Sequence, residues 1–325
     1  MSSPSRIVSL LPSATEMLFT LGLGERVVAV SHECDYPDEV KSKPRATVST
    51  IDSTASSLEL DRTVQHKLSA GQPLYQIDLP LLESLDCDLL ITQSQCDVCA
   101  IDQAEVIAAL EKGGLADHIS VMTLHPQSLE DVFDDLMRIG RRCGKEQYAE
   151  LKVSEYRQRI ANVQCKLSHL RDEDHPRTTI IEWIDPLMLA GNWIPELLRL
   201  AGGQGPIEEA AGKSVVATWD AVIAFAPEVM VLCPCGFDVP RICREAQQMK
   251  QWPSFTSLPA VGNQRSYAID GNAYFNRSGP RLVESLEILA HLLHPQHIGP
   301  PIHLEQQAAW CQLSLENNAN DPRDF

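Results

Sequence analysis

The stretch Lys145–Arg171, KEQYAELKVSEYRQRIANVQCKLSHLR, decides the fold of this chain. It contains no proline or glycine, and its apolar side chains recur at spacings close to three and four residues, which is the pattern of an amphipathic helix. These side chains are Tyr148, Leu151, Tyr156, Ile160, Val163, Leu167 and Leu170. At 1.5 Å per residue the helix is about 40 Å long, enough to cross a whole domain. The polar residues RDEDHPR at 171–177 end it.

Strand and helix patterns alternate on both sides of this helix. Before it, strands are predicted at Arg6–Leu11, Val27–Ser31, Asp88–Gln93 and His118–Leu124, and helices at Ser56–Ser69, Asp102–Lys112, Ser128–Arg142 and from Ser13, where Glu16 completes a capping box. After it, strands are predicted at Thr178–Ile184, Glu228–Cys233 and Ser266–Ile269, and helices at 195–203, Asp238–Lys250 and Pro280–Leu293. This alternation predicts an α/β protein with mainly parallel sheets.

The two halves also resemble each other locally. TEMLFTLG at 15–22 resembles PELLRLAGG at 195–203, and LESLDCDLLITQSQC at 82–96 resembles IAFAPEVMVLCPCG at 223–236. We therefore predict two similar Rossmann-like lobes joined by one long α-helix. The predicted parts are an N-terminal lobe at 1–143, the joining helix at 144–172, a C-terminal lobe at 173–295 and a partly disordered tail at 296–325, with a short docking helix around Glu305–Leu315.

Composition narrows the class of protein. An apolar fraction of 44% and a charged fraction of 22% are ordinary for a globular chain. The net charge of −17 opposes binding to nucleic acid or to an anionic membrane surface. No segment approaches the roughly 20 apolar residues that a membrane-spanning helix needs, and the apolar run Ile7–Leu11 is too short for an export signal. We expect a cytoplasmic protein that does not insert into membranes.

Cysteines gather where predicted strands end. ITQSQCDVCAID at 91–102 places Cys96 and Cys99 directly behind a buried strand; His32 and Cys34 follow another strand, and Cys235 a third. Ligands bind beyond the carboxyl ends of strands in open α/β sheets. The cysteines could form a redox pair, ligate zinc or an iron–sulfur cluster, or line a pocket as plain buried thiols. A reducing compartment favours metal binding or burial over disulfides for the ten cysteines.

Aromatic residues of the second half also fall near strand ends. Trp219 follows a polar segment, and Tyr274 and Phe275 lie in a loop rich in glycine and asparagine, so these three look least like core residues. Flat rings near amide and guanidinium groups suit a large, flat, partly polar ligand. Arg277 and Arg281 are candidates to pair with a carboxylate or phosphate, or are surface charges at a helix start. The chain has no Gly-x-Ser-x-Gly, no Gly-x-Gly-x-x-Gly and no P-loop lysine, so we predict no enzyme activity.

Four stretches resemble a known family. They are RIVSLLPSATEMLFTLGLGERVVAVSHECDYP at 6–37, CDLLITQSQC at 87–96, PEVMVLCPCGFD at 227–238 and YAIDGNAYFNRSGPRLVESLEILAHLL at 267–293. They resemble the cobalamin- and iron-siderophore-binding proteins of ABC importers, over roughly residues 5–295. The resemblance implies two α/β lobes bridged by a single long helix, with the ligand in the cleft. It is closest to the cobalamin-binding branch, which implies that Tyr36 of the DYP loop lines the cleft, that Trp219 packs on the corrin and that Phe275 and Arg277 supply contacts.

The chain also departs from that branch. Where the branch uses tryptophans in the first lobe, this chain has Ile51 or Asp52, and Ser94 or Gln95, and we expect it to carry no export signal. It therefore resembles a subgroup without a signal, in which docking to an ABC permease is not expected.

We predict non-enzymatic binding of a cobalamin-like corrinoid or another metal chelate in the inter-lobe cleft. The expected ligand contacts are Tyr36, Trp219, Asn272, Tyr274, Phe275 and Arg277, and the hypothetical metal ligands are His32, Cys34, Cys96, Cys99 and Cys235. One alternative is a metalloprotein whose cleft cysteines hold zinc or an iron–sulfur cluster. Another is an exported importer component whose signal lies outside this sequence.

Overall fold

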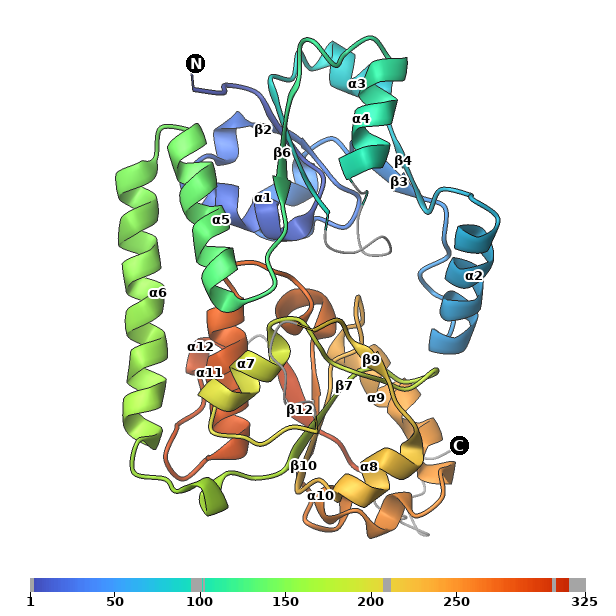
Figure 1. Ribbon diagram of the computed structural model, residues 1–325, viewed down its shortest axis with the longest axis vertical. Helices are drawn as coiled ribbons and strands as arrows, with labels where there is room; N and C mark the ends of the chain where they lie inside the picture. Colours follow the sequence, from blue (N-terminus) through green and yellow to red (C-terminus); the bar gives the residue numbers. More distant parts are fainter. Residues whose placement is uncertain (1–2, 95–100, 102, 207–211, 306–307, 316–325) are drawn as a thin grey trace. The chain divides into compact units, whose positions relative to one another are not determined.

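The computed structural model describes residues 3–94, 101, 103–206, 212–305 and 308–315 (Figure 1). Its contacts divide the chain into two compact units. The first comprises Met1–Gln158 with Ser278–Pro280, and the second comprises Arg159–Arg277 with Arg281–Phe325. Each unit is built around its own β-sheet. Within the described residues, no helix is both long enough and apolar enough to cross a membrane.

The first unit contains a four-stranded sheet in which every neighbouring pair is parallel, in the order β2-β1-β5-β6. Its strands are β1 (Ile7–Ser9), β2 (Val27–Val30), β5 (Leu89–Gln93) and β6 (Ser120–Leu124). A separate antiparallel pair consists of β3 (Thr47–Ser49) and β4 (Tyr75–Ile77). The helices are α1 (Pro12–Thr20), η1 (Gly24–Arg26), η2 (Asp38–Ser42), α2 (Ser57–Ser69), α3 (Leu79–Ser84), α4 (Gln103–Lys112) and α5 (Leu129–Arg142).

Helices cover both faces of this sheet, with α1 and α5 on one side and α3 and α4 on the other (Figure 1). All five residues of β5 are buried, as expected of a central parallel strand whose two faces are both covered. Leu82 of α3 and Val106 and Leu110 of α4 belong to the same apolar cluster as Val8 and Leu90 of the sheet. Burial of this apolar face holds α3 and α4 on the sheet.

The second unit contains a six-stranded sheet in the order β12-β11-β10-β7-β8-β9. The three central strands, β7 (Thr178–Trp183), β10 (Val229–Leu232) and β11 (Ser266–Ile269), are parallel. The outer strands β8 (Met188–Leu189), β9 (Val215–Val216) and β12 (Trp310–Gln312) pair antiparallel with their neighbours. Parallel central strands bring their carboxyl ends to one edge of the sheet, where binding sites of such sheets form.

Helices of the second unit lie on both sides of its sheet, with α7 and α11 together on one side and α8 and α9 on the other (Figure 1). The helices are η3 (Asp172–Asp174), α7 (Ile194–Leu200), α8 (Trp219–Phe225), α9 (Val239–Ala246), η4 (Gln247–Gln251), η5 (Phe255–Ser257), α10 (Pro259–Gly262), η6 (Gly271–Phe275), α11 (Leu282–Leu293) and α12 (Ile302–Glu305).

The long helix that the sequence predicts is α6 (Glu146–Leu167). Its 22 residues correspond to about 33 Å. In the chain it leads from one unit to the other, since the division falls between Gln158 and Arg159. The fold is thus two α/β units joined by one long helix, which confirms the predicted fold class.

Two local predictions are wrong. Helix α1 begins at Pro12 with Leu11 as its N-cap, and no side chain caps it; proline is favoured in the first helical turn, so Ser13 lies inside the helix and does not open it. The described part of the predicted docking helix at Glu305–Leu315 contains the strand β12 instead. This strand pairs with the edge of β11, and the gain of main-chain hydrogen bonds at an open edge outweighs weak local helix propensity.

Candidate functional site

The carboxyl ends of β7 and β10 bring two aromatic rings together in the second unit. Trp183 is the last residue of β7, and Phe237 lies in the turn after β10. Their ring centroids are 5.2 Å apart in a tilted arrangement. The guanidinium carbon of Arg241, on the first turn of α9, lies 3.4 Å from the centroid of the Phe237 ring. Phe237 is buried and Trp183 half-buried, so the indole forms the accessible surface of this pair.

The loop after β11 joins the same edge. The backbone N–H groups of Gly271 and Asn272 donate to the carbonyl oxygen of Phe237 at 3.0 and 3.3 Å. The carboxylate of Asp270 caps the turn η6 by accepting from the backbone N–H of Ala273 at 2.8 Å. The loop is therefore fixed to the turn after β10, and Asn272 within it is half-buried.

Asn272 is also held by a charged group. Its side-chain oxygen accepts from the Arg277 guanidinium at 2.9 Å, and Arg277 itself is buried. The sequence predicted both residues as ligand contacts, and the structure brings them together. We name Trp183, Cys235, Phe237, Arg241 and Asn272 the strand-end cluster.

Cys235 and Glu182 complete this edge. The backbone N–H of Cys235 donates to the carbonyl oxygen of Glu182 at 3.2 Å, which attaches the turn after β10 to β7. The Glu182 carboxylate accepts from the Ser214 hydroxyl at 2.7 and 2.8 Å. Burial raises the pKa of Glu182, because the charged form loses hydration. Cys235 is half-buried, whereas Cys233 beside it is fully buried.

Tyr274 and Phe275 are core residues, whereas the sequence predicted that they lie outside the core in an open loop. They are 3% and 0% exposed. The carbonyl oxygen of Phe275 accepts from the buried indole of Trp193 at 2.8 Å, and the guanidinium of Arg281 lies over the Tyr274 ring at 5.4 Å. A glycine- and asparagine-rich segment suggests an open loop, but the turn η6 folds both rings inward.

Trp219 belongs to a different aromatic group. Its ring lies 4.8 Å from that of Trp252 and 5.9 Å from that of Phe255. Its indole N–H donates to the carbonyl oxygen of Pro253 at 2.8 Å. The strand-end tryptophan is Trp183, which sequence reasoning did not select. Its position one residue before the end of the predicted strand Thr178–Ile184 was the available signal.

In the first unit, three predicted site residues follow β2. The Nδ1 of His32 lies 2.7 Å from the Thr47 hydroxyl, and its ring lies 5.1 Å from that of Tyr75. Cys34 is buried, with its sulfur 3.1 Å from the hydroxyl of Thr15. Tyr36 is 48% exposed. Of the three, Tyr36 presents the largest accessible surface, while Cys34 is held as a core thiol.

Only some of the predicted metal ligands, His32, Cys34 and Cys235, are among the described residues. In the described part of the chain, no three or more histidine, cysteine, aspartate or glutamate side chains form a group that could hold a metal ion. Cys96 and Cys99 lie outside the described residues. A zinc or iron–sulfur site that includes them stays a prediction.

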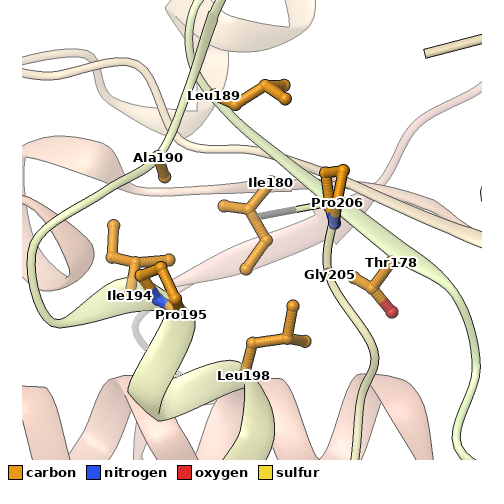
Figure 2. Close-up of a pocket in the computed structure, with 9 residues that line it drawn as sticks. All are labelled: Thr178, Ile180, Leu189, Ala190, Ile194, Pro195, Leu198, Gly205 and Pro206. Carbon is orange, nitrogen blue, oxygen red and sulfur yellow. The ribbon is translucent and has the colours of Figure 1, made fainter. Parts of the chain in front are cut away.

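An apolar pocket lies elsewhere in the second unit (Figure 2). It is lined by Thr178, Ile180, Leu189, Ala190, Ile194, Pro195, Leu198, Gly205 and Pro206, and encloses about 250 Å³ including space open to solvent. The hydroxyl of Thr178 already donates to the carbonyl oxygen of Pro176 at 3.0 Å. A site that orients a ligand needs several polar groups, so the strand-end cluster is the stronger candidate.

Curated relatives match this chain over most of its length. An uncharacterized ABC transporter substrate-binding lipoprotein, YvrC of Bacillus subtilis (strain 168), is 25% identical over 297 residues, covering 90% of this chain and 81% of the relative. A vitamin B12-binding protein of Vibrio vulnificus (strain CMCP6) is 24% identical over 287 residues, covering 87% of each chain.

Solved structures show the same fold. The periplasmic vitamin B12 binding protein BtuF of Vibrio cholerae superposes with a TM-score of 0.64 at 19% identity, covering 90% of this chain and 97% of that one. A periplasmic heme binding protein from Pseudomonas aeruginosa has a TM-score of 0.67 at 20% identity, covering 90% and 94%. A family model described as "Periplasmic binding protein" matches residues 7–273. The chain therefore belongs to the periplasmic binding protein family.

Proposed function

We propose that this protein binds a cobalamin-like corrinoid, or a closely related flat metal chelate, at the strand-end cluster of its second unit. The curated relatives named as vitamin B12-binding proteins support the corrinoid. The structural similarity to a heme binding protein supports the wider class of flat metal chelates.

The observation that carries the proposal is the composition of the strand-end cluster. A half-buried indole, Trp183, lies against the buried ring of Phe237. The backbone N–H of Asn272 donates to the Phe237 carbonyl oxygen, and Arg277 holds the Asn272 amide. A corrin is a broad, largely apolar ring with amide groups at its rim. An indole face suits the ring, and a fixed amide suits the rim, because an amide both donates and accepts hydrogen bonds.

Arg277 positions Asn272 in this proposal. The bond from its guanidinium occupies the oxygen of the Asn272 amide and orients the side chain. Arg277 is 8% exposed, so its expected effect on binding is mainly indirect. A contact from Tyr36 stays a prediction from the resemblance, and contacts from Cys96 and Cys99 stay predictions from their place after a strand.

Equilibrium dialysis against cyanocobalamin, hemin and a ferric siderophore tests the ligand class, with bound chelate read from its visible absorbance. We expect saturable binding of cyanocobalamin at one site per chain. Trp183→Ala should weaken it about tenfold or more, the factor that a loss of about 1.4 kcal/mol of ring contact produces. Cobalt, zinc and iron analysis of the protein as purified separates a bound corrinoid from a protein metal site.

Trp219→Ala is the matched control, because it removes the same side chain from a different aromatic group. We expect it to change affinity by less than about threefold. Loss of binding in Trp219→Ala with none in Trp183→Ala would move the site to the residue that the resemblance implies. Stoichiometric zinc or iron that is lost in Cys96→Ser/Cys99→Ser, with no chelate bound, would favour the metalloprotein instead.

A cytoplasmic location is a further part of this proposal, and it rests on the sequence alone. Fractionation of the cells that express the natural gene, with blotting of the cytoplasmic and envelope fractions, tests the location. Recovery of the protein in the envelope would overturn it.

A further inference from the structure

Two cysteines far apart in the sequence meet in the second unit. The sulfurs of Cys243 and Cys311 lie 3.3 Å apart, although the residues are 68 positions apart. Cys243 is on α9 and Cys311 is in β12. Both are half-buried free thiols, so a small reagent has access to them. An S–S bond is about 2.05 Å long, so the sulfurs need to approach by little more than 1 Å to join.

The two cysteines connect the C-terminal strand to elements that form the strand-end cluster. Strand β12 pairs with β11, with Cys311 opposite Ala268. Beyond this pairing, the backbone N–H of Asp270 donates to the carbonyl oxygen of Ala309 at 2.9 Å. Helix α9 begins directly after Phe237 and Asp238, and it carries Arg241. A bond between these cysteines would therefore tie β12 to the helix on one side of the cluster, while β12 already holds the loop on the other.

The contact also makes one thiol reactive. A hydrogen bond from the Cys243 thiol lowers the pKa of Cys311 to about 7, and the same contact raises the pKa of Cys243. Near neutral pH a substantial fraction of Cys311 is thiolate, which is the nucleophilic form. Cys87, Cys143 and Cys233 contrast with it, because burial raises the pKa of each.

We propose that Cys243 and Cys311 form a reversible disulfide that fastens the C-terminal strand β12 to helix α9 under oxidising conditions. The oxidant is a low-molecular-weight disulfide. This inference goes beyond the proposed ligand binding and does not depend on which ligand the protein takes.

The exchange occurs in two balanced steps. The Cys311 thiolate attacks one sulfur of the external disulfide, and one thiolate leaves as a mixed disulfide forms on Cys311. Cys243 then loses its proton to solvent and attacks the Cys311 sulfur, and the second thiolate leaves. Two protein thiols are oxidised to one disulfide, and one external disulfide is reduced to two thiols, which take up the two protons that the cysteines released.

Oxidised glutathione, followed by alkylation and trypsin digestion without reduction, tests the bond on the full-length chain. Trypsin is expected to release Cys243 in the tripeptide 242–244 and Cys311 in the peptide 282–323, because the next arginines lie at those ends. We expect these two peptides to be recovered as one cross-linked species, which dithiothreitol separates. Cys243→Ser and Cys311→Ser should each abolish it, while the control Cys165→Ser, at an exposed cysteine, should not.

Hydrogen exchange separates the bond from its structural effect. In the oxidised protein the amides of residues 266–277 should exchange several-fold more slowly than in the reduced protein, and Cys243→Ser should show no such difference. Recovery of Cys243 and Cys311 as alkylated thiols or as separate glutathione adducts overturns the disulfide. A cross-link without slower exchange overturns the fastening of the strand.

Discussion

Gly271 lies directly against the carbonyl oxygen of Pro234. A side-chain carbon built on Gly271 would fall 2.1 Å from that oxygen and 2.6 Å from the carbonyl oxygen of Cys233. Both obstacles are backbone atoms at the exit of β10, which cannot rotate away as a side chain can. The absence of a side chain at position 271 is what lets the loop after β11 reach the turn that carries Phe237.

Gly271→Ala should therefore disrupt the strand-end cluster. The clash forces the loop away from Phe237, so we expect the free energy of unfolding to fall by at least about 2 kcal/mol. Urea denaturation followed by tryptophan fluorescence measures this change. Gly262→Ala is the control, since nothing lies within 4 Å of a side-chain carbon there; alanine in place of a helical glycine should leave stability unchanged or raise it slightly. Equal stability of both variants would show that the loop tolerates a side chain.

Two indole N–H groups make bonds of the same length in different surroundings. The Nε1 of Trp193 donates to the Phe275 carbonyl inside the core, and the Nε1 of Trp219 donates to the Pro253 carbonyl at the surface, both at 2.8 Å. Trp193→Phe should destabilise the protein by about 1–3 kcal/mol, because a buried carbonyl loses its partner. Trp219→Phe should cost less than about 1 kcal/mol, since water can replace the bond. Thermal or chemical unfolding of the pair tests this order, and equal losses would contradict it.

Asp135 predicts a pH dependence of stability. Burial raises its pKa to about 6, even though Arg138 donates to its Oδ1 at 2.5 Å. Among the described residues, its buried Oδ2 has no hydrogen-bond partner. The folded state thus holds this proton more tightly than the unfolded state does. The stabilisation from the protonated Asp135 carboxyl is full below about pH 4 and is lost as the pH rises through about 6. At about 1.4 kcal/mol per pKa unit, it amounts to roughly 3 kcal/mol.

Asp135→Asn should remove that dependence. Unfolding free energies measured from pH 4 to pH 7 should fall more steeply in the wild type than in the variant. Asp134→Asn, at the exposed neighbouring position, is the control and should keep the wild-type slope. Parallel curves for all three proteins would mean that Asp135 ionises normally in the folded protein.

The ion pair between Arg159 and Glu287 joins the long helix α6 to α11 within the second unit. The guanidinium donates to both carboxylate oxygens, at 2.9 and 2.7 Å, and both side chains are partly buried. We expect a coupling energy near 1 kcal/mol from a double-mutant cycle with Arg159→Ala and Glu287→Ala. The pair Lys152–Glu155, with one bond of 2.7 Å on the same helix, should couple by only about 0.3–0.5 kcal/mol. If the coupling energy of Arg159–Glu287 is no larger than that of Lys152–Glu155, the bidentate contact adds no stability beyond that of an ordinary surface ion pair.

The elements of the fold were predictable because their signals are local. Helix α6 follows from apolar spacing without proline or glycine, and the strand Ser266–Ile269 has the predicted bounds. Ser128 is the N-cap of α5 and forms a capping box with Asp131, an arrangement that a serine just before a helix favours. The helix start at Ser13 was misplaced by one residue because Pro12 competes for the first turn. The strand β12 was missed because its pairing partner lies far away in the sequence.

The sequence by itself determined the two α/β units, the long helix between them and the edge of the second sheet at which the candidate site residues gather. Apolar periodicity and helix caps are read from residues close together in the sequence. Once the strands are predicted, the rule that ligands bind beyond the carboxyl ends of parallel strands locates the edge. Tertiary structure alone decided that Tyr274 and Phe275 turn into the core, that Trp183 meets Phe237 and that Cys243 meets Cys311. Those outcomes depend on contacts between residues distant in the chain, and burial is a property of the packed molecule that no local pattern encodes.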